Sequence, residues 1–182
     1  MRTNQALAAG IHSRVLYAMR DSGVIEAIDR GLYRLTDMPP LESPDLFTAA
    51  SKVSQGVICL ISALAFHDLT TQIPRSVSIA LPKGAEQPRI AYPPMQFHRF
   101  SEPAFSEGIQ AHKRDGVTLR VYSPEKTLAD CFKFRKKIGI DICIEALRDW
   151  QKKKEADSNK LMYFAKICRI DKIIRPYVEA LI

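Results

Sequence analysis

His67 and Asp68 stand side by side, directly after an apolar stretch and just before Thr70, Thr71 and Gln72. Such a pair could act in acid–base catalysis or bind a metal ion. Adjacent residues do not share a helix face, however, and no second His/Glu pair has the spacing of metal ligands. The alternative, which we favour, is a helix C-terminus whose free carbonyl groups are met by these polar side chains.

Glu125 and Lys126 form a second candidate, with Asp130 about one helical turn later. Nucleases group acids and a lysine around a metal ion, but restriction-type folds use the spacing Glu-x-Lys on a strand. Here the two residues are adjacent and follow Ser123-Pro124, which is typical of a helix start. The chain also lacks a Gly-rich phosphate loop, G-x-S-x-G and H-E-x-x-H. We therefore expect no enzyme activity, no catalytic residue, no cofactor and no metal site.

The first part of the chain alternates between helix and turn signals. Thr3 and Ser13 are suited to cap helices over residues 4–9 and 14–22, and a glycine follows each helix. Residues 24–35 contain two runs of strand composition around a glycine turn, which predicts a β-hairpin. Helix, turn, helix and two-stranded ribbon is the order of a winged helix-turn-helix.

A DNA-binding unit of this kind needs polar and cationic side chains on its second helix and at its wing. The candidates are Ser13, Arg14, Tyr17 and Arg20 on the helix, and Arg30 at the tip of the hairpin. The alternative is that the helical arginines only solvate the helix, while Tyr17 covers the local core.

Prolines near residues 39–43 predict a linker between a unit over 1–38 and a larger body over 44–182. Within the body, alternation of apolar and polar residues predicts a sheet over about 76–122. Apolar residues at helical spacing predict helices over about 123–182. The helices expected there and before the sheet cover about 44–52, 57–66, 123–133, 141–154, 158–168 and 171–182. The predicted fold class is α+β, a winged helix followed by a mixed domain with a small sheet and a C-terminal helical bundle.

Positive charge is concentrated in the last third of the chain. The 182 residues contain 27 Lys and Arg against 20 Asp and Glu, with a net charge of +7. Residues 1–38 hold a net charge of +1, residues 39–125 are neutral and residues 126–182 hold +6. The densest cluster is Lys133, Arg135, Lys136 and Lys137. If these side chains share a surface they could bind nucleic acid or an acidic protein; if they are dispersed, they are solvated helix exteriors.

The remaining composition indicates a cytoplasmic protein without membrane contact. The longest apolar run, residues 56–61, is too short to span a bilayer. Cys59, Cys131, Cys143 and Cys168 stand within apolar patterns and form no C-x-x-C pair, so we expect reduced core cysteines.

Several motifs resemble the AbiEi family of type IV toxin–antitoxin antitoxins, in the same order and over nearly the whole chain. The specific blocks are Ser62-Ala63-Leu64, His67-Asp68-Leu69-Thr70-Thr71-Gln72-Ile73-Pro74 and Glu125-Lys126-Thr127-Leu128-Ala129-Asp130-Cys131-Phe132-Lys133. Arg30-Gly31-Leu32-Tyr33 at the expected wing is a weaker match. Family members usually have about one more helix before the region that matches Thr3. Two alternatives follow: the winged helix is truncated here, or another part of the chain or a partner covers its exposed apolar side.

The resemblance implies an autorepressor that binds double-stranded DNA at inverted repeats in its promoter and counters a nucleotidyltransferase-like toxin. It maps DNA contacts onto Ser13, Arg14, Tyr17 and Arg30, with a contribution from a basic C-terminal surface. Two alternatives stay open: an antitoxin module that acts through protein contacts, and a solitary transcriptional regulator without a toxin. A metal-dependent nuclease is a third hypothesis. DNA cleavage with Mg²⁺ that is abolished in Glu125→Ala would support it.

Overall fold

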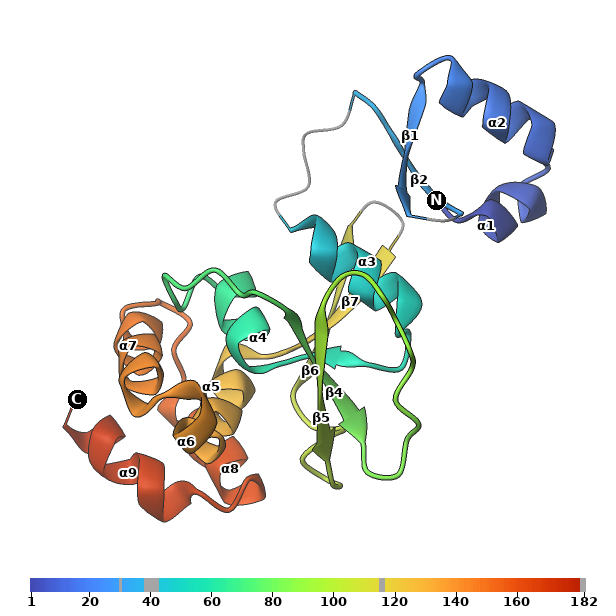
Figure 1. Ribbon diagram of the computed structural model, residues 1–182. Helices are drawn as coiled ribbons and strands as arrows, with labels where there is room; N and C mark the ends of the chain where they lie inside the picture. The colour runs from blue at the N-terminus through green and yellow to red at the C-terminus, as the bar shows by residue number, and fades with distance from the viewer. Residues whose placement is uncertain (30, 38–42, 115–116, 181–182) are drawn as a thin grey trace.

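The computed structural model describes residues 1–29, 31–37, 43–114 and 117–180. It confirms an α+β architecture of helices and two small sheets. A small N-terminal unit stands at one end of a larger body, in which helices pack around a five-stranded sheet (Figure 1).

The N-terminal unit follows the predicted order of elements. Helices α1 (Thr3–Ala8) and α2 (Ser13–Asp21) precede the antiparallel strands β1 (Ile25–Asp29) and β2 (Leu32–Leu35). The glycines after the two helices, Gly10 and Gly23, have φ angles of 82° and 75°, a left-handed conformation that favours glycine.

The predicted helix caps are each one residue too late. Arg2, not Thr3, is the N-cap of α1, and Arg2 N–H donates to the Gln5 side chain. His12, not Ser13, caps α2, because its Nδ1 accepts a hydrogen bond from Arg14 N–H at 3.2 Å. Histidine is not a common N-cap residue, so the sequence pattern pointed to the neighbouring serine.

A small core holds the N-terminal unit together and a second contact joins it to the body. Ala6, Leu16, Ile25 and Tyr33 are buried against one another. Leu32 on the hairpin instead belongs to the apolar cluster of helix α3 (Pro44–Lys52), and the Arg2 guanidinium donates to the carbonyl oxygen of Ser51. The expected linker, residues 39–43, lies almost wholly outside the described residues.

The sheet of the body contains one strand that the sequence did not reveal. Its order is β5-β4-β3-β7-β6, and its strands are β3 (Val57–Ile58), β4 (Val77–Pro82), β5 (Met95–Phe100), β6 (Ile109–Arg114) and β7 (Val117–Tyr122). The prediction of a helix over 57–66 was wrong at its start, because Val57 pairs with Ala80 and Ile58 pairs with Val121. The helix there, α4, covers only Leu60–Phe66.

The C-terminal helices lie in the region where the spacing of apolar residues predicted helices, but their bounds differ from the predicted ones. They are α5 (Pro124–Lys133), α6 (Arg135–Ile138), α7 (Ile140–Gln151), α8 (Ser158–Ile167) and α9 (Asp171–Glu179). The short α6 was not predicted, and α7 ends three residues before the expected Lys154. Helices α5, α7, α8 and α9 lie together on one side of the sheet, while α3 lies towards the N-terminal unit (Figure 1).

Two apolar clusters fill the body. One joins α3 to the sheet through residues such as Phe47, Ile79 and Leu119. The other joins α4 and the C-terminal helices through residues such as Leu64 and Phe132. All four cysteines are buried and unpaired, as predicted. None of the helices over the described residues has the length and apolar composition needed to cross a membrane.

Candidate nucleic-acid interface

Helix α2 presents the predicted polar face to solvent. Leu16 anchors the helix in the small core, and Arg14 and Tyr17 lie on its exposed side, with Tyr17 46% exposed. The guanidinium carbon of Arg20 lies 5.2 Å from the Tyr17 ring centroid, and its Nη2 lies 2.7 Å from Asp21 Oδ1. Ser13 is half-buried at the first turn. Residues at i, i+4 and i+7 share one helix face, which places Ser13, Tyr17 and Arg20 together.

The region predicted to form a wing is described in part. Strands β1 and β2 form the predicted hairpin, and Arg30, which was predicted at its tip, lies outside the described residues. The hairpin keeps Tyr33 in the small core and holds Arg34 within 3.1 Å of Glu26 through its Nε. The described part of the hairpin is therefore a support for α2.

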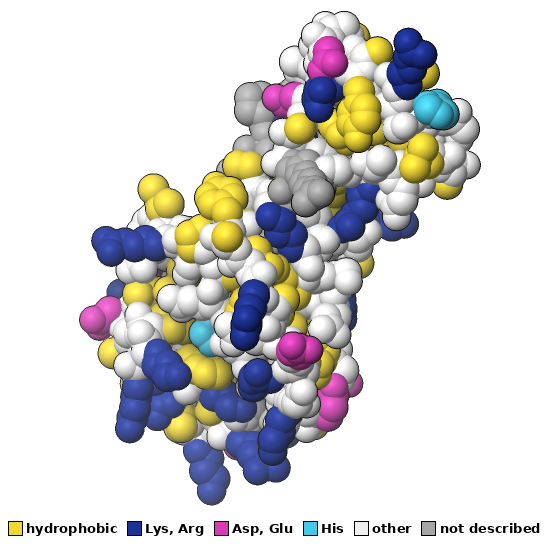
Figure 2. Space-filling view, turned by 45° about the vertical axis from the view of Figure 1, so that its right-hand side comes forward, with side chains coloured by type: hydrophobic (Ala, Val, Ile, Leu, Met, Phe, Trp, Pro, Cys, Tyr) yellow, Lys and Arg dark blue, Asp and Glu magenta, His cyan; other side chains and the backbone are white. Residues whose placement is uncertain are grey.

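The second predicted group forms a basic corner, which we define as Lys133, Arg135, Lys136 and Lys137. Lys133 ends α5, and Lys136 and Lys137 are exposed on α6. Arg135 is half-buried, because its Nη1 donates to the Phe132 carbonyl at 3.0 Å. Lys and Arg side chains gather at the lower end of the body, where Figure 1 shows α6, α8 and α9 (Figure 2).

The basic corner and the face of α2 lie at opposite ends of the molecule (Figure 1). Each group is brought together within itself, but the two do not form one continuous surface. On the N-terminal unit, the few basic side chains are interleaved with hydrophobic and acidic ones (Figure 2). The two predicted groups are therefore separate surfaces.

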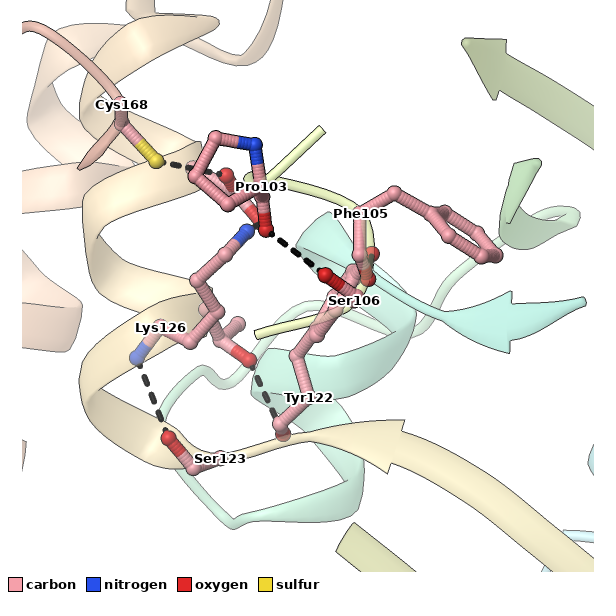
Figure 3. Close-up of polar contacts among 9 residues, drawn as sticks. Pro103, Phe105, Ser106, Tyr122, Ser123, Lys126 and Cys168 are labelled. Atoms are coloured by element: carbon pink, nitrogen blue, oxygen red, sulfur yellow. Dashed lines mark hydrogen bonds and ion pairs between the residues drawn. The ribbon is translucent and has the colours of Figure 1, made fainter. Parts of the chain in front are cut away.

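A buried polar network occupies the start of α5, where we had predicted only a helix start. Ser123 is the N-cap and its Oγ accepts a hydrogen bond from Lys126 N–H, as predicted for the cap (Figure 3). The Lys126 ammonium, however, lies 2.5 Å from Asp130 Oδ2, with both side chains fully buried. The predicted helix start is therefore present, and the structure adds that Lys126 and Asp130 are buried.

Aromatic and sulfur groups complete the surroundings of this ion pair. Lys126 Nζ lies 4.1 Å from the centroid of the Tyr122 ring, a cation–π contact. The Cys168 thiol donates to Asp130 Oδ1 at 3.2 Å. Burial raises the pKa of Cys168 to about 12, so it stays a protonated donor. Gly108 leaves the room for Lys126, since a Cβ there would meet Lys126 Cβ at 2.7 Å.

Glu125 is also engaged inside the protein. Its Oε1 accepts a hydrogen bond from Trp150 Nε1 at 3.2 Å, and its side chain is buried.

Asp130 is buried as well. Burial raises the pKa of its carboxyl group above the ordinary value, and the ammonium of Lys126 offsets part of that rise. Among the described residues, no group of three or more His, Cys, Asp and Glu side chains is placed to hold a metal ion. These carboxylates hold helices together.

His67 does end a helix, but its partners differ from those expected. It is the C-cap of α4, and its Nε2 donates to the Tyr122 carbonyl at 2.7 Å, which selects the Nε2-protonated tautomer. The carbonyl of His67 accepts from the Lys153 ammonium. Thr71 instead donates to Glu145 at 3.2 Å, and Thr70 accepts from Gln72 N–H. Burial lowers the pKa of His67, and nearby His112 and Lys153 lower it further.

No local signal in the sequence reveals the buried network. Lys126, Asp130 and Lys133 have i, i+4 and i+7 spacing, so they share one helix face as the residues of an exposed polar face would. The burial of Lys126 and Asp130 follows from contacts with residues distant in sequence, such as Cys168.

No protein-family model matches the chain, and no curated protein matches it. The exposed face of α2 and the basic corner are therefore the surfaces of this chain that bear on function.

Proposed function

We propose that this protein is a sequence-specific DNA-binding regulator of the AbiEi antitoxin type, which represses its own operon. The observation that supports the proposal is an exposed α2 held on a helix–turn–helix and hairpin scaffold, with Arg14 and Tyr17 directed to solvent. This order of elements suits insertion of a second helix into the major groove. The winged helix itself is part of the proposal.

In this proposal α2 supplies the base contacts. Arg14 lies in the first turn, and the N-terminal residues of a recognition helix are those that reach base edges. An arginine can donate two hydrogen bonds to guanine, and each such pair contributes about 1–3 kcal/mol of discrimination. Tyr17 and Ser13 have hydroxyl groups that suit phosphate or base contacts.

The basic corner supplies attraction that does not depend on sequence. Lys136 and Lys137 are exposed on α6 and lie away from α2. Each neutralised phosphate releases counterions, so such contacts make binding depend on salt. Because the corner and α2 are at opposite ends, the corner meets either a distant stretch of DNA or an acidic protein surface.

The variant Arg14→Ala tests the proposal. It should weaken binding to the promoter fragment by about 1–3 kcal/mol and affect random DNA much less. Arg148→Ala is the matched control, since Arg148 is exposed on α7 and its replacement removes the same charge. Fluorescence anisotropy at a fixed salt concentration measures the affinity of each variant for promoter and random DNA. Equal losses for the two variants on promoter DNA would reject α2 as the reading element.

A second candidate is an antitoxin module that acts through protein contacts. The basic corner favours it, because a cationic surface remote from α2 suits an acidic region of a toxin. Co-expression with a nucleotidyltransferase-like toxin from a neighbouring gene tests this candidate. Loss of rescue in Lys136→Glu/Lys137→Glu, with rescue retained in Arg14→Ala, would favour it over repression alone.

A further inference from the structure

One large apolar side chain of the body stands almost entirely in water. Ile73 follows α4 in the segment that leads to β4, and it is 91% exposed. It is the most exposed large hydrophobic side chain of the described residues. Its burial against another apolar surface would be favourable, because it removes apolar surface from water.

Ile73 forms one wall of a partly apolar hollow. The other walls include Leu46 of α3, Ala65 of α4, Val77 of β4 and Tyr92, and the volume is about 290 Å³. A cavity of about 150 Å³ already holds benzene, so the hollow has room for an isoleucine side chain. The Ser62 hydroxyl at this site is satisfied, because it accepts from Ser78 N–H and donates to the Ser76 carbonyl.

Opposite charges accompany the protruding side chain and the hollow. Asp45 lies on the wall of the hollow, where its Oδ1 accepts from the Tyr92 hydroxyl at 2.8 Å. Arg75 is exposed two residues after Ile73. Within the described part of the chain, neither Asp45 nor Arg75 takes part in an ion pair. Each charge is therefore available to a partner.

We infer that this surface binds a second copy of the chain through a two-fold contact. Ile73 of each copy enters the hollow of the other, and Arg75 pairs with Asp45 of the partner subunit. A contact of this kind is isologous: the same patch is used twice, so protrusion and hollow must lie on one chain, as they do here. The charges are arranged in the same way. Arg75 lies near the protruding Ile73, and the carboxylate of Asp45 lies on the wall of the hollow.

Charge reversal and mixing test this inference. In Arg75→Asp the introduced carboxylate faces Asp45 of the partner subunit, and in Asp45→Arg the introduced guanidinium faces Arg75 of the partner subunit. Each variant alone should have a dimer dissociation constant raised by about tenfold or more, because like charges face each other twice. A mixture of the two variants restores one opposite-charge contact between the two native side chains and one between the two introduced side chains. The mixture should therefore form a heterodimer with about the wild-type constant.

Sedimentation equilibrium of the full chain measures these constants, with a monomer of 20.5 kDa as reference. Ile73→Asp is a further variant that removes no described contact within the chain, and it should also abolish dimers. Arg148→Asp, which reverses the same charge on α7, should leave them intact.

Three results would each overturn the inference: a wild-type chain that stays monomeric into the millimolar range, dimers that persist in Ile73→Asp, or charge variants that fail to pair when mixed. None of these assays contains DNA, so each result is independent of the proposed repressor function.

Discussion

The Lys126 ammonium lies 2.5 Å from Asp130 Oδ2, one helical turn along α5, and neither side chain has solvent exposure. Charges so deeply buried persist only because each neutralises the other, with Tyr122 and Cys168 completing their contacts. One of the two blocks that resemble antitoxin motifs is therefore an internal support, and the proposed function rests on exposed surfaces.

Removal of one partner should strongly destabilise the fold. Lys126→Met leaves Asp130 buried without its counter-ion, so the free energy of unfolding should fall by about 3–5 kcal/mol. The double variant Lys126→Met/Asp130→Leu should recover much of that loss, because no charge stays buried. Urea denaturation measures both, with exposed Lys136→Met as the control. A single variant as stable as the control would contradict the role of the pair.

Glu125 should behave as a structural acceptor for Trp150. Glu125→Gln keeps an oxygen at the same place and should be nearly neutral, whereas Glu125→Ala leaves the indole N–H unpaired and should cost about 1–3 kcal/mol. Trp150 is the one tryptophan of the chain, so its fluorescence reports this change directly. Cleavage of labelled DNA with Mg²⁺, lost in Glu125→Gln, would instead support the nuclease hypothesis.

Much of the fold could be predicted from local patterns. Glycines marked the ends of α1 and α2, alternation marked the long strands, and Ser123-Pro124 marked the start of α5. Strand β3 was missed because two residues are too few to show an alternating pattern. Only its pairing with Ala80 and Val121 identifies it as a strand.

The candidate site was predictable in part. The polar face of α2 follows from helical spacing, and the structure places it in solvent. The separation of α2 from the basic corner depends on long-range packing, so no local pattern indicates it. The same holds for the contact from His67 to Tyr122, which joins residues 55 positions apart.

His67 should make stability depend on pH. Burial lowers its pKa in the folded state, so below the usual value of about 6.5 the unfolded chain binds the proton first. The free energy of unfolding should therefore fall as the pH drops from about 7 towards 5. His67→Gln should flatten this dependence, measured as urea midpoints across the pH series. A slope unchanged by the substitution would assign it to other groups, such as His98, whose pKa burial also lowers.

Reversing the charge of the basic corner should lower the affinity for all DNA without changing the preference for promoter DNA over random DNA. Lys136→Glu/Lys137→Glu should weaken binding to promoter and random DNA alike and reduce the salt slope by about one for each lost phosphate contact. Salt titrations by anisotropy measure this slope. If DNA binding is unchanged, the corner serves solubility or a protein partner.

The ratio of affinities for promoter DNA and for a scrambled duplex of equal length tests the central claim most directly. A repressor that reads sequence through α2 should bind its upstream inverted repeats at least about 10³-fold more tightly at physiological salt, and Arg14→Ala should reduce that ratio. A ratio near one, with both affinities falling together as salt rises, would contradict sequence-specific repression.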